Sequence, residues 1–411
     1  FKPIYETRYP VGDFDDALPM VKQFLKEAKQ ASKLDEIRLK KACLAIAGAI
    51  DKKNNKCKMT NWPLEIDGNL LAQKLNISQN LILINDFEAV AYGIKFLKDR
   101  YLVILQEGKP QENGLIAVIG AATGLGKSFL VRQANGEIAF ATEGGHTDFA
   151  PRSQLEFDLL EFVRDNVLIR DKKLRNGRIV IIFAFCLFIQ SGLHRLASLL
   201  LCPNNRVSVE RIVSGRGIVA IYRFLQERDD RSQILQQFQK QRIEKLQEKR
   251  KGVSLEKDRE KISKEIEKIQ SLKTVPEISI EQMIRNWQEE DDRCLESVDP
   301  AAVIAAAALN KRDLICMKTM QMFVELYGAE VGNFALQFLP YGGLYIAGGI
   351  TPQILDLIQE YDFLKAFSNK GRMIELLEKI PLYVVKNMEV GLMGAVHYAA
   401  TKIGCEEKSE V

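Results

Sequence analysis

The sequence has few of the residues that build metal sites or disulfide frameworks. Its seven cysteines, an odd number, include no pair at CxxC spacing, and its three histidines form no cluster. This pattern disfavours a zinc site and favours a reducing compartment. The longest apolar run, IVIIFAFCLFI (179–189), is about half a membrane span, and no signal-peptide pattern is visible. We therefore expect a cytoplasmic protein without a membrane anchor.

The chain also lacks a strong excess of either charge sign. Its formal net charge of +4 is small for 411 residues, and its aromatic residues are scattered. Nothing in this composition indicates nucleic acid as a partner. With 46% apolar and 27% charged residues, the chain has an ordinary globular composition. Its length allows two or three domains of hydrophobic core.

Strand-like and helix-like segments alternate along the chain, which is typical of the α/β class. Apolar residues recur at helical spacing over 16–33, and the apolar run 41–50 predicts a buried strand. Residues 226–292 are dense in both charge signs, with isoleucines spaced along one helical face. They predict a solvated helical excursion or a short coiled hairpin. Residues 299–336 predict a long helical stretch.

The octapeptide AATGLGKS (121–128) matches a permissive Walker A pattern, in which Lys127 would reach phosphate oxygens and Ser128 would hold Mg²⁺. A Walker A loop must open a helix that faces the phosphates. Residues 127–145 instead place two apolar runs around an Asn-Gly dipeptide, which is typical of a hairpin turn. We therefore expect strands on both sides of the glycines, with Lys127 a strand residue rather than a phosphate clamp.

The Asn85-Asp86 pair lies where an apolar strand meets a helix, within LILINDFEAVAYGIKFL (81–97). Ligands of α/β sheets bind at the carboxyl ends of the strands, so Asp86 stands in a favourable place for chemistry. Phosphorylation of a hydroxyl needs a carboxylate that accepts the hydroxyl proton. The residues alone leave an alternative open, in which Asp86 is the N-cap of the following helix.

Five stretches in one order resemble a known family. They are INDFEAVAYG, GAATGLGKSFLV, EGGHTDFAPR, VERIVSGRGI and YIAGGITP. Together they resemble the bacterial-type glucokinases, which are ATP-dependent hexose kinases of the actin-like ATPase superfamily. The resemblance implies an α/β fold of the ribonuclease H-like kind, with a cleft between two lobes. We expect a small lobe over 1–112, joined by a C-terminal helix at 394–411, and a large lobe over 113–393. Atypical insertions are expected near 167–205 and 226–292.

The resemblance also implies a role for each motif, with Asp86 as the catalytic base. The implied sugar-binding residues are Asn61, Asn85, Asp86, Glu143, His146 and Glu210. The implied nucleotide-binding residues are Thr123, Gly124 and Gly126 in a phosphate loop, and Gly348 and Gly349 in an adenosine loop. Glycines in such loops let the backbone approach the ligand closely. Taken alone, EGGH would be a polar loop with a structural histidine, and the Gly-Gly pair a tight turn.

The function that the resemblance implies is transfer of the γ-phosphate of ATP to the 6-hydroxyl of glucose, with Mg²⁺, at the start of glycolysis. A kinase for another hexose and a non-catalytic sugar-binding protein remain alternatives. No helix-turn-helix or basic reading segment is evident, which disfavours a repressor. Because the family forms dimers, the resemblance also implies a homodimer.

Two features depart from the family pattern. The first phosphate loop, an Asp-x-Gly-Gly-Thr hairpin, is not found, and FKPIYETRYP corresponds to a family segment that follows it. We therefore expect the chain to keep its sugar-pocket residues and to transfer phosphate poorly. Residues 167–205 carry an extra apolar stretch, either a genuine insertion or translated non-coding sequence. The second case would indicate an intron-bearing source, and a plastid location if that source is photosynthetic.

Overall fold

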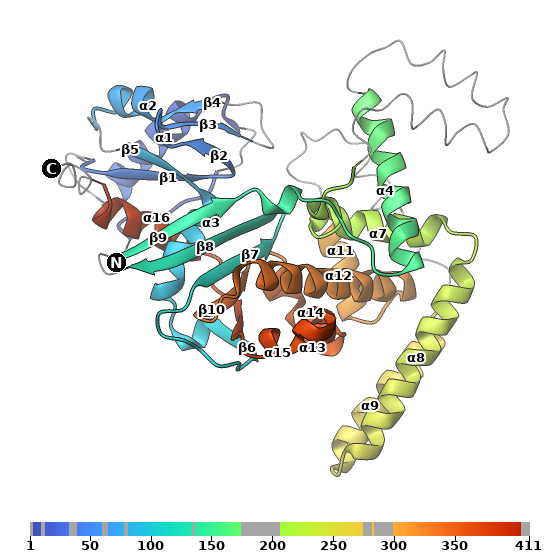
Figure 1. Ribbon diagram of the computed structural model, residues 1–411. Coiled ribbons are helices and arrows are strands. Elements are labelled where there is room, and N and C mark those ends of the chain that lie inside the picture. The colour runs from blue at the N-terminus through green and yellow to red at the C-terminus, as the bar shows by residue number, and fades with distance from the viewer. Residues whose placement is uncertain are drawn as a thin grey trace.

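The computed structural model describes residues 3–9, 13–32, 39–59, 65–77, 81–133, 136–173, 206–273, 282 and 299–403. Within these residues the chain forms a smaller lobe and a larger lobe, at the upper left and the centre of Figure 1. Asn61 and the apolar run 179–189 lie outside the described residues. Among the described helices, none combines the length and the apolar character needed to cross a bilayer.

The small lobe contains two short sheets and two helices. In chain order its elements are α1 (Ala17–Ser32), β1 (Ala42–Ile46), β2 (Gly48–Asp51), β3 (Lys56–Met59), β4 (Glu65–Asp67), α2 (Gly68–Lys74) and β5 (Leu81–Asn85). β1 pairs with β5 in parallel, whereas β2, β3 and β4 form an antiparallel sheet. The single strand predicted over 41–50 is therefore two strands, because the chain leaves one sheet at Ala47 and enters the other.

The large lobe is built on a six-stranded sheet with the order β6-β11-β10-β7-β8-β9. Its strands are β6 (Leu102–Gln106), β7 (Ile116–Ala121), β8 (Leu125–Gln133), β9 (Gly136–Thr142), β10 (Gly343–Ala347) and β11 (Leu382–Val385). β10 runs parallel to both β7 and β11, and the other pairs are antiparallel. Every residue of β7 is buried. The predicted hairpin after the glycines is confirmed, because β8 and β9 pair along their length.

Helices pack around this sheet, and 18 of the 25 residues of α12 are buried. They are α4 (Gln154–Lys173), α7 (Gly215–Glu227), α8 (Arg231–Gly252), α9 (Glu256–Ser271), α11 (Pro300–Leu309), α12 (Leu314–Phe338), α13 (Leu355–Glu360), α14 (Phe363–Ser368) and α15 (Ile374–Leu377). The helical stretch predicted over 299–336 is two helices. Lys311 takes a left-handed conformation with φ of 50°, and Asp313 then caps α12 by accepting from the Cys316 amide at 2.8 Å.

The charged stretch after 226 forms the expected helical hairpin, α8 followed by α9, which projects from the large lobe in Figure 1. Ile262, Ile266 and Ile269 are buried on the face of α9 that packs on α8. Arg242 of α8 is only 8% exposed and forms ion pairs with Glu265 and Glu360. The hairpin is thus held to the lobe by both apolar and ionic contacts.

Two helices join the lobes. α3 (Asp86–Gly93) begins where β5 ends, and α16 (Val390–Thr401) packs against it and against β1. The helices contact so closely that a Cβ atom on Gly394 would lie 1.7 Å from the carbonyl oxygen of Ala89. The lobe boundary near 112 stays a prediction. β6 precedes that boundary in the chain but pairs with β11 in the large sheet.

Candidate active site

Asn85 and Asp86 divide two roles between them at the end of β5. The side-chain oxygen of Asn85 accepts hydrogen bonds from the amides of Phe87 at 2.9 Å and Glu88 at 3.3 Å, so Asn85 is the N-cap of α3. Its amide group donates to the Gly48 carbonyl at 3.1 Å. The N-cap alternative considered for Asp86 is therefore wrong. Asp86 is the first helical residue, and its carboxylate accepts from the following amide of Phe87 at 2.9 Å.

The surroundings of Asp86 favour a carboxylate that takes up a proton. Burial raises its pKa above the ordinary value of an aspartate, while backbone N–H groups of Phe87 and Asp86 partly offset this. The negative charge of Glu143 raises the pKa further. Glu143 therefore acts electrostatically on Asp86, while the shared sugar-binding role predicted for the two residues stays a prediction. A carboxylate with these properties is suited to general-base chemistry.

The EGGH loop lies just after β9 and forms a single turn, η4 (Gly144–His146). Nε2 of His146 lies 3.6 Å from a carboxylate oxygen of Glu143, and the two side chains are 41% and 54% exposed. The loop packs tightly on β8, because a Cβ atom on Gly145 would lie 2.1 Å from the Leu125 carbonyl oxygen. The loop thus presents two polar side chains while its backbone is fixed to the sheet.

Glu210 lies against the predicted phosphate turn as well as near the sugar-side residues. It belongs to a short helical turn, η5 (Val209–Arg211), and its carboxylate accepts from the Leu125 amide at 3.0 Å. A Cβ atom on Gly124 would lie 2.6 Å from the same carboxylate, so a larger residue there would displace the end of the Glu210 side chain. The turn itself is closed by the Ala122 amide, which donates to the Gly124 carbonyl at 2.8 Å.

The rest of the Walker-like octapeptide faces the interior. Lys127 and Ser128 are 2% and 0% exposed, and they lie in β8 rather than at the start of a helix. The Walker A interpretation is therefore excluded, as predicted. The Ser128 hydroxyl donates to the Phe87 carbonyl at 2.8 Å, and the Phe87 ring occupies the space beside Gly126. These residues anchor the start of α3, immediately next to Asp86.

The predicted adenosine loop begins where β10 ends. Gly348 has a φ of +85°, and a Cβ atom there would lie 2.5 Å from the Ala121 carbonyl oxygen at the end of β7. Tyr327 of α12 joins the two strand ends, since its hydroxyl accepts from the Ala121 amide at 3.1 Å and lies 3.3 Å from the Thr351 hydroxyl. The loops predicted for phosphate and adenosine are thus neighbours.

Several residues that organise the site were missed by sequence reasoning, namely Phe87, Tyr327 and Glu330. Phe87 is adjacent to Asp86, and the glycines at 124 and 126 were a signal that some bulky group packs there. Tyr327 and Glu330 lie on a helix more than 200 positions away from the contacts they make in β7 and β8, so no local pattern reveals them. The role predicted for Asn61 falls on a residue outside the described part of the chain.

Two cavities in the described structure, of about 310 and 300 Å³, lie elsewhere on the large lobe. The first is lined by residues of β6, α13 and α14, and the second by residues of α8, α12 and the segment before α14. Neither contains a residue predicted for the site. Within the described residues, no group of three or more acidic, histidine or cysteine side chains could hold a metal ion by itself.

Comparison with known proteins gives the family. The family model described as Glucokinase matches residues 2–179 and 193–402. The glucokinase of Nostoc punctiforme is 41% identical over 397 residues, covering 97% of this chain and 91% of that protein. The chain belongs to the glucokinase family. The glucokinase of Synechocystis is 36% identical, covering 97% of this chain and 89% of that protein.

Family membership confirms the predicted activity class, an ATP-dependent hexose kinase. The match omits 180–192, inside the stretch 167–205 that we expected to be atypical. It runs unbroken through 226–292, which we also expected to be atypical.

Solved glucokinase structures share the fold. One from an Antarctic psychrotroph aligns with a TM-score of 0.59 at 22% identity, covering 97% of this chain and 89% of that one. Another, from Balamuthia mandrillaris in complex with glucose, aligns with a TM-score of 0.60 at 18% identity, covering 94% of this chain and 85% of that one. The predicted two-lobed, actin-like ATPase fold is confirmed.

Proposed function

We propose that this chain transfers the γ-phosphate of ATP to the 6-hydroxyl of glucose, with Asp86 as the general base. The observation that carries the proposal is the state of Asp86. Asn85, rather than Asp86, is the N-cap of α3, which leaves the Asp86 carboxyl available. Burial and the charge of Glu143 raise the pKa of this carboxyl. In the reaction, Asp86 takes the hydroxyl proton while the sugar oxygen bonds to the γ-phosphorus. The bond from that phosphorus to the bridging oxygen breaks, and ADP leaves.

The sugar would be held by residues on both sides of Asp86. Glu143 and His146 present exposed polar groups from the EGGH loop, and Glu210 presents a carboxylate from η5. Sugar hydroxyls both donate and accept, so a ring of carboxylate and imidazole groups can satisfy several of them at once. Asn85 and Asn61 complete the proposed set.

The nucleotide would lie across the ends of β7 and β10. Thr123, Gly124 and Gly126 would face its phosphates, and Gly348 and Gly349 would allow the adenosine to approach the backbone. The close spacing of these two loops, fixed by Gly348 and Ala121, supports one ligand spanning both. Mg²⁺ would arrive with the phosphates, because this ion is commonly held by substrate phosphates, waters and few protein carboxylates.

The test is an assay of ATP-dependent phosphorylation with a panel of hexoses. ADP release is the measured quantity, and Asp86→Ala is the control. We expect glucose to be turned over faster than the other hexoses and Asp86→Ala to lose at least about 100-fold in kcat. Glucose binding without any ATP turnover would overturn the kinase proposal. Preference for another hexose would overturn only the choice of substrate.

The proposal includes a cytoplasmic location and a homodimer. The cysteine pattern supports a reducing compartment, since the seven cysteines are odd in number and lie far apart in the sequence. Light scattering of the purified full chain tests the homodimer, and a monomer mass at micromolar concentration would contradict it.

A further inference from the structure

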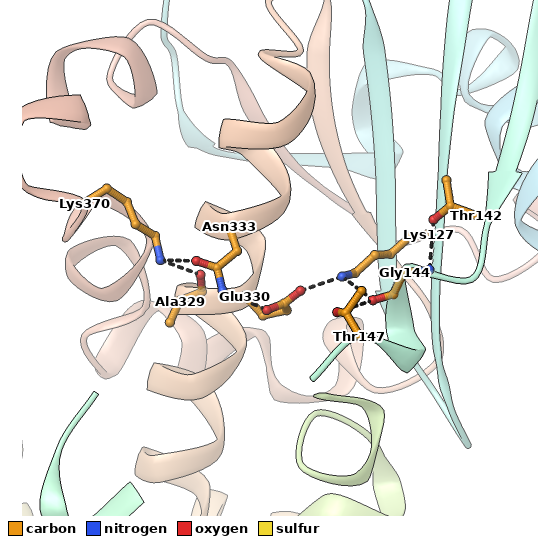
Figure 2. Close-up of polar contacts among 8 residues, drawn as sticks. All are labelled: Lys127, Thr142, Gly144, Thr147, Ala329, Glu330, Asn333 and Lys370. Atoms are coloured by element: carbon orange, nitrogen blue, oxygen red, sulfur yellow. Dashed lines mark hydrogen bonds and ion pairs between the residues drawn. The ribbon is translucent and has the colours of Figure 1, made fainter. Parts of the chain in front are cut away.

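Lys127 is a buried cation in a place where β8 could carry an apolar side chain. Its side chain is 2% exposed, and its ammonium group lies 2.5 Å from a carboxylate oxygen of Glu330 on α12. The same nitrogen donates to the carbonyl oxygen of Gly144 at 2.9 Å and lies 5.4 Å from the centre of the Phe334 ring. Figure 2 shows Lys127 between the helix and the loop that contains Gly144.

The partners of Lys127 are themselves held in place. The second carboxylate oxygen of Glu330 accepts from the Asn333 side chain at 3.0 Å, and the Asn333 oxygen accepts from the ammonium group of Lys370 at 2.5 Å. Lys370 also donates to the Ala329 carbonyl at 3.0 Å. Figure 2 follows these contacts from Lys370 to Gly144. Both oxygens of Glu330 are therefore used, so its position is set from two sides.

A buried ion pair of this kind is weak evidence for a gain in stability. Removing two charges from water costs several kcal/mol, and well-packed apolar residues of similar volume are often equally or more stabilising. Stability alone therefore does not account for a lysine here. What apolar residues could not supply is the hydrogen bond to Gly144, whose carbonyl also accepts from the Thr147 hydroxyl at 2.9 Å.

Gly144 lies between Glu143 and His146, the two loop residues proposed to bind sugar. The loop packs directly against the Lys127 side chain, because a Cβ atom on Gly144 would lie 2.9 Å from Cδ of Lys127. The Gly144 carbonyl is thus a point at which a buried side chain of the core holds the sugar loop, beside the packing of Gly145 on Leu125. A rigid point of this kind sets the distance and direction of the flanking side chains.

We infer that Lys127 is a positioning residue for the sugar-binding loop, which it fixes to α12 through Glu330. The inference rests on the proposed function, in that Glu143 and His146 must bind glucose. It gives the lysine of the octapeptide a role at the sugar rather than at the phosphates.

Three variants separate positioning from stability. Lys127→Met removes the cation and leaves Glu330 buried without its partner. Lys127→Met with Glu330→Leu removes both charges and fills their volume. Arg242→Met is the matched control, because Arg242 is another buried cation of the large lobe with ion pairs to Glu265 and Glu360, away from the loop. The readouts on the full chain are the thermal midpoint, the Kd of glucose by calorimetry, and the KM of ATP.

We expect Lys127→Met to lower the thermal midpoint and to raise the glucose Kd about 10-fold or more, with the ATP KM within about 2-fold. The double variant should recover most of the midpoint yet keep the raised glucose Kd, because the hydrogen bond from residue 127 to Gly144 is still missing. Arg242→Met should lower the midpoint and leave the glucose Kd unchanged.

Recovery of the midpoint and the glucose Kd together in the double variant would overturn the inference, and so would an unchanged Kd in Lys127→Met. If Lys127→Met does not fold, the double variant carries the same comparison. Failure of the unaltered chain to bind glucose would be a separate result, which overturns the proposed function and this inference with it.

Discussion

The ring of Phe87 occupies the space that a side chain on Gly126 would need: a Cβ atom there would lie 1.9 Å from a ring carbon. β8 thus passes directly over the first turn of α3, and the Ser128 hydroxyl donates to the Phe87 carbonyl two residues further along the strand. Because Phe87 follows Asp86, the glycine next to the phosphate turn also determines where the base lies.

Gly126→Ala should therefore displace Phe87 and Asp86. Overpacking of this kind costs about 1–3 kcal/mol of stability. We expect a lower kcat beyond that loss of stability, because the carboxylate moves away from the hydroxyl it must deprotonate. The measurement is kcat at saturating substrates, together with urea denaturation.

Phe87→Leu supplies the control for this substitution. Combined with Gly126→Ala, it shortens the group that clashes and should restore part of both kcat and stability. Strictly additive losses in the double variant would contradict direct contact between the two positions.

Asp86→Asn should separate chemistry from folding. Loss of the general base should lower kcat by about 10²–10⁴-fold. The folded-state pKa of Asp86 is raised, so ionising this carboxyl destabilises the folded chain. This penalty is absent below the unfolded pKa of about 3.9, where the carboxyl is protonated in both the folded and the unfolded state. The parent chain therefore loses stability, relative to Asp86→Asn, as pH rises through the raised pKa. The thermal midpoint of the variant should equal or exceed that of the parent at neutral pH.

Asn85→Ala is the matched control, because it removes the cap and leaves the base. Its expected cost is about 1 kcal/mol of stability. A larger loss of stability in Asp86→Asn than in Asn85→Ala would show that Asp86, rather than Asn85, supports the start of α3.

The pH dependence of kcat should reveal the charge of Glu143 at Asp86. Activity requires the Asp86 carboxylate, so kcat should fall as pH drops through the raised pKa of this group. Glu143→Gln removes a negative charge that raises that pKa, and the acidic limb should move to lower pH. Profiles at saturating glucose make the comparison independent of weaker sugar binding. An acidic limb that stays in place would show that burial alone sets the pKa.

Local signals in the sequence predicted much of the fold and the position of the base. The strand-to-helix change at Asn85 and Asp86 is visible because apolar residues end there and a capping residue follows. The Asn-Gly dipeptide after β8 is also a local signal, because its position between two apolar runs predicts a hairpin rather than the helix of a Walker A motif. The division of 299–336 was missed although Asp313 is a capping residue, because apolar residues continue on both sides of the break.

The contacts that assemble the site could not be predicted, because they join distant segments. Lys127 and Glu330 are 203 positions apart, and Leu125 and Glu210 are 85 apart. Nothing within the octapeptide distinguishes a lysine that reaches phosphate from one that reaches a helix of the core. The burial of Lys127 distinguishes the two roles, and that burial depends on how the whole sheet is assembled.

Gly348 and Gly349 test the nucleotide site as a pair, because the structure gives them different constraints. Gly348 has a φ of +85° and lies against the Ala121 carbonyl, whereas a Cβ atom on Gly349 would meet only the mobile end of the Met388 side chain, at 3.3 Å. Gly348→Ala should thus cost about 1–3 kcal/mol of stability, through backbone strain and collision.

Gly349→Ala should leave stability within about 0.5 kcal/mol of the parent, since it disturbs neither backbone nor core. If adenosine approaches this glycine as proposed, the added methyl group should still raise the KM of ATP several-fold while leaving the Kd of glucose unchanged. An ATP KM equal to that of the parent would instead mean that the Gly-Gly pair serves only the turn after β10, and that Gly348 is required by its conformation rather than by the nucleotide.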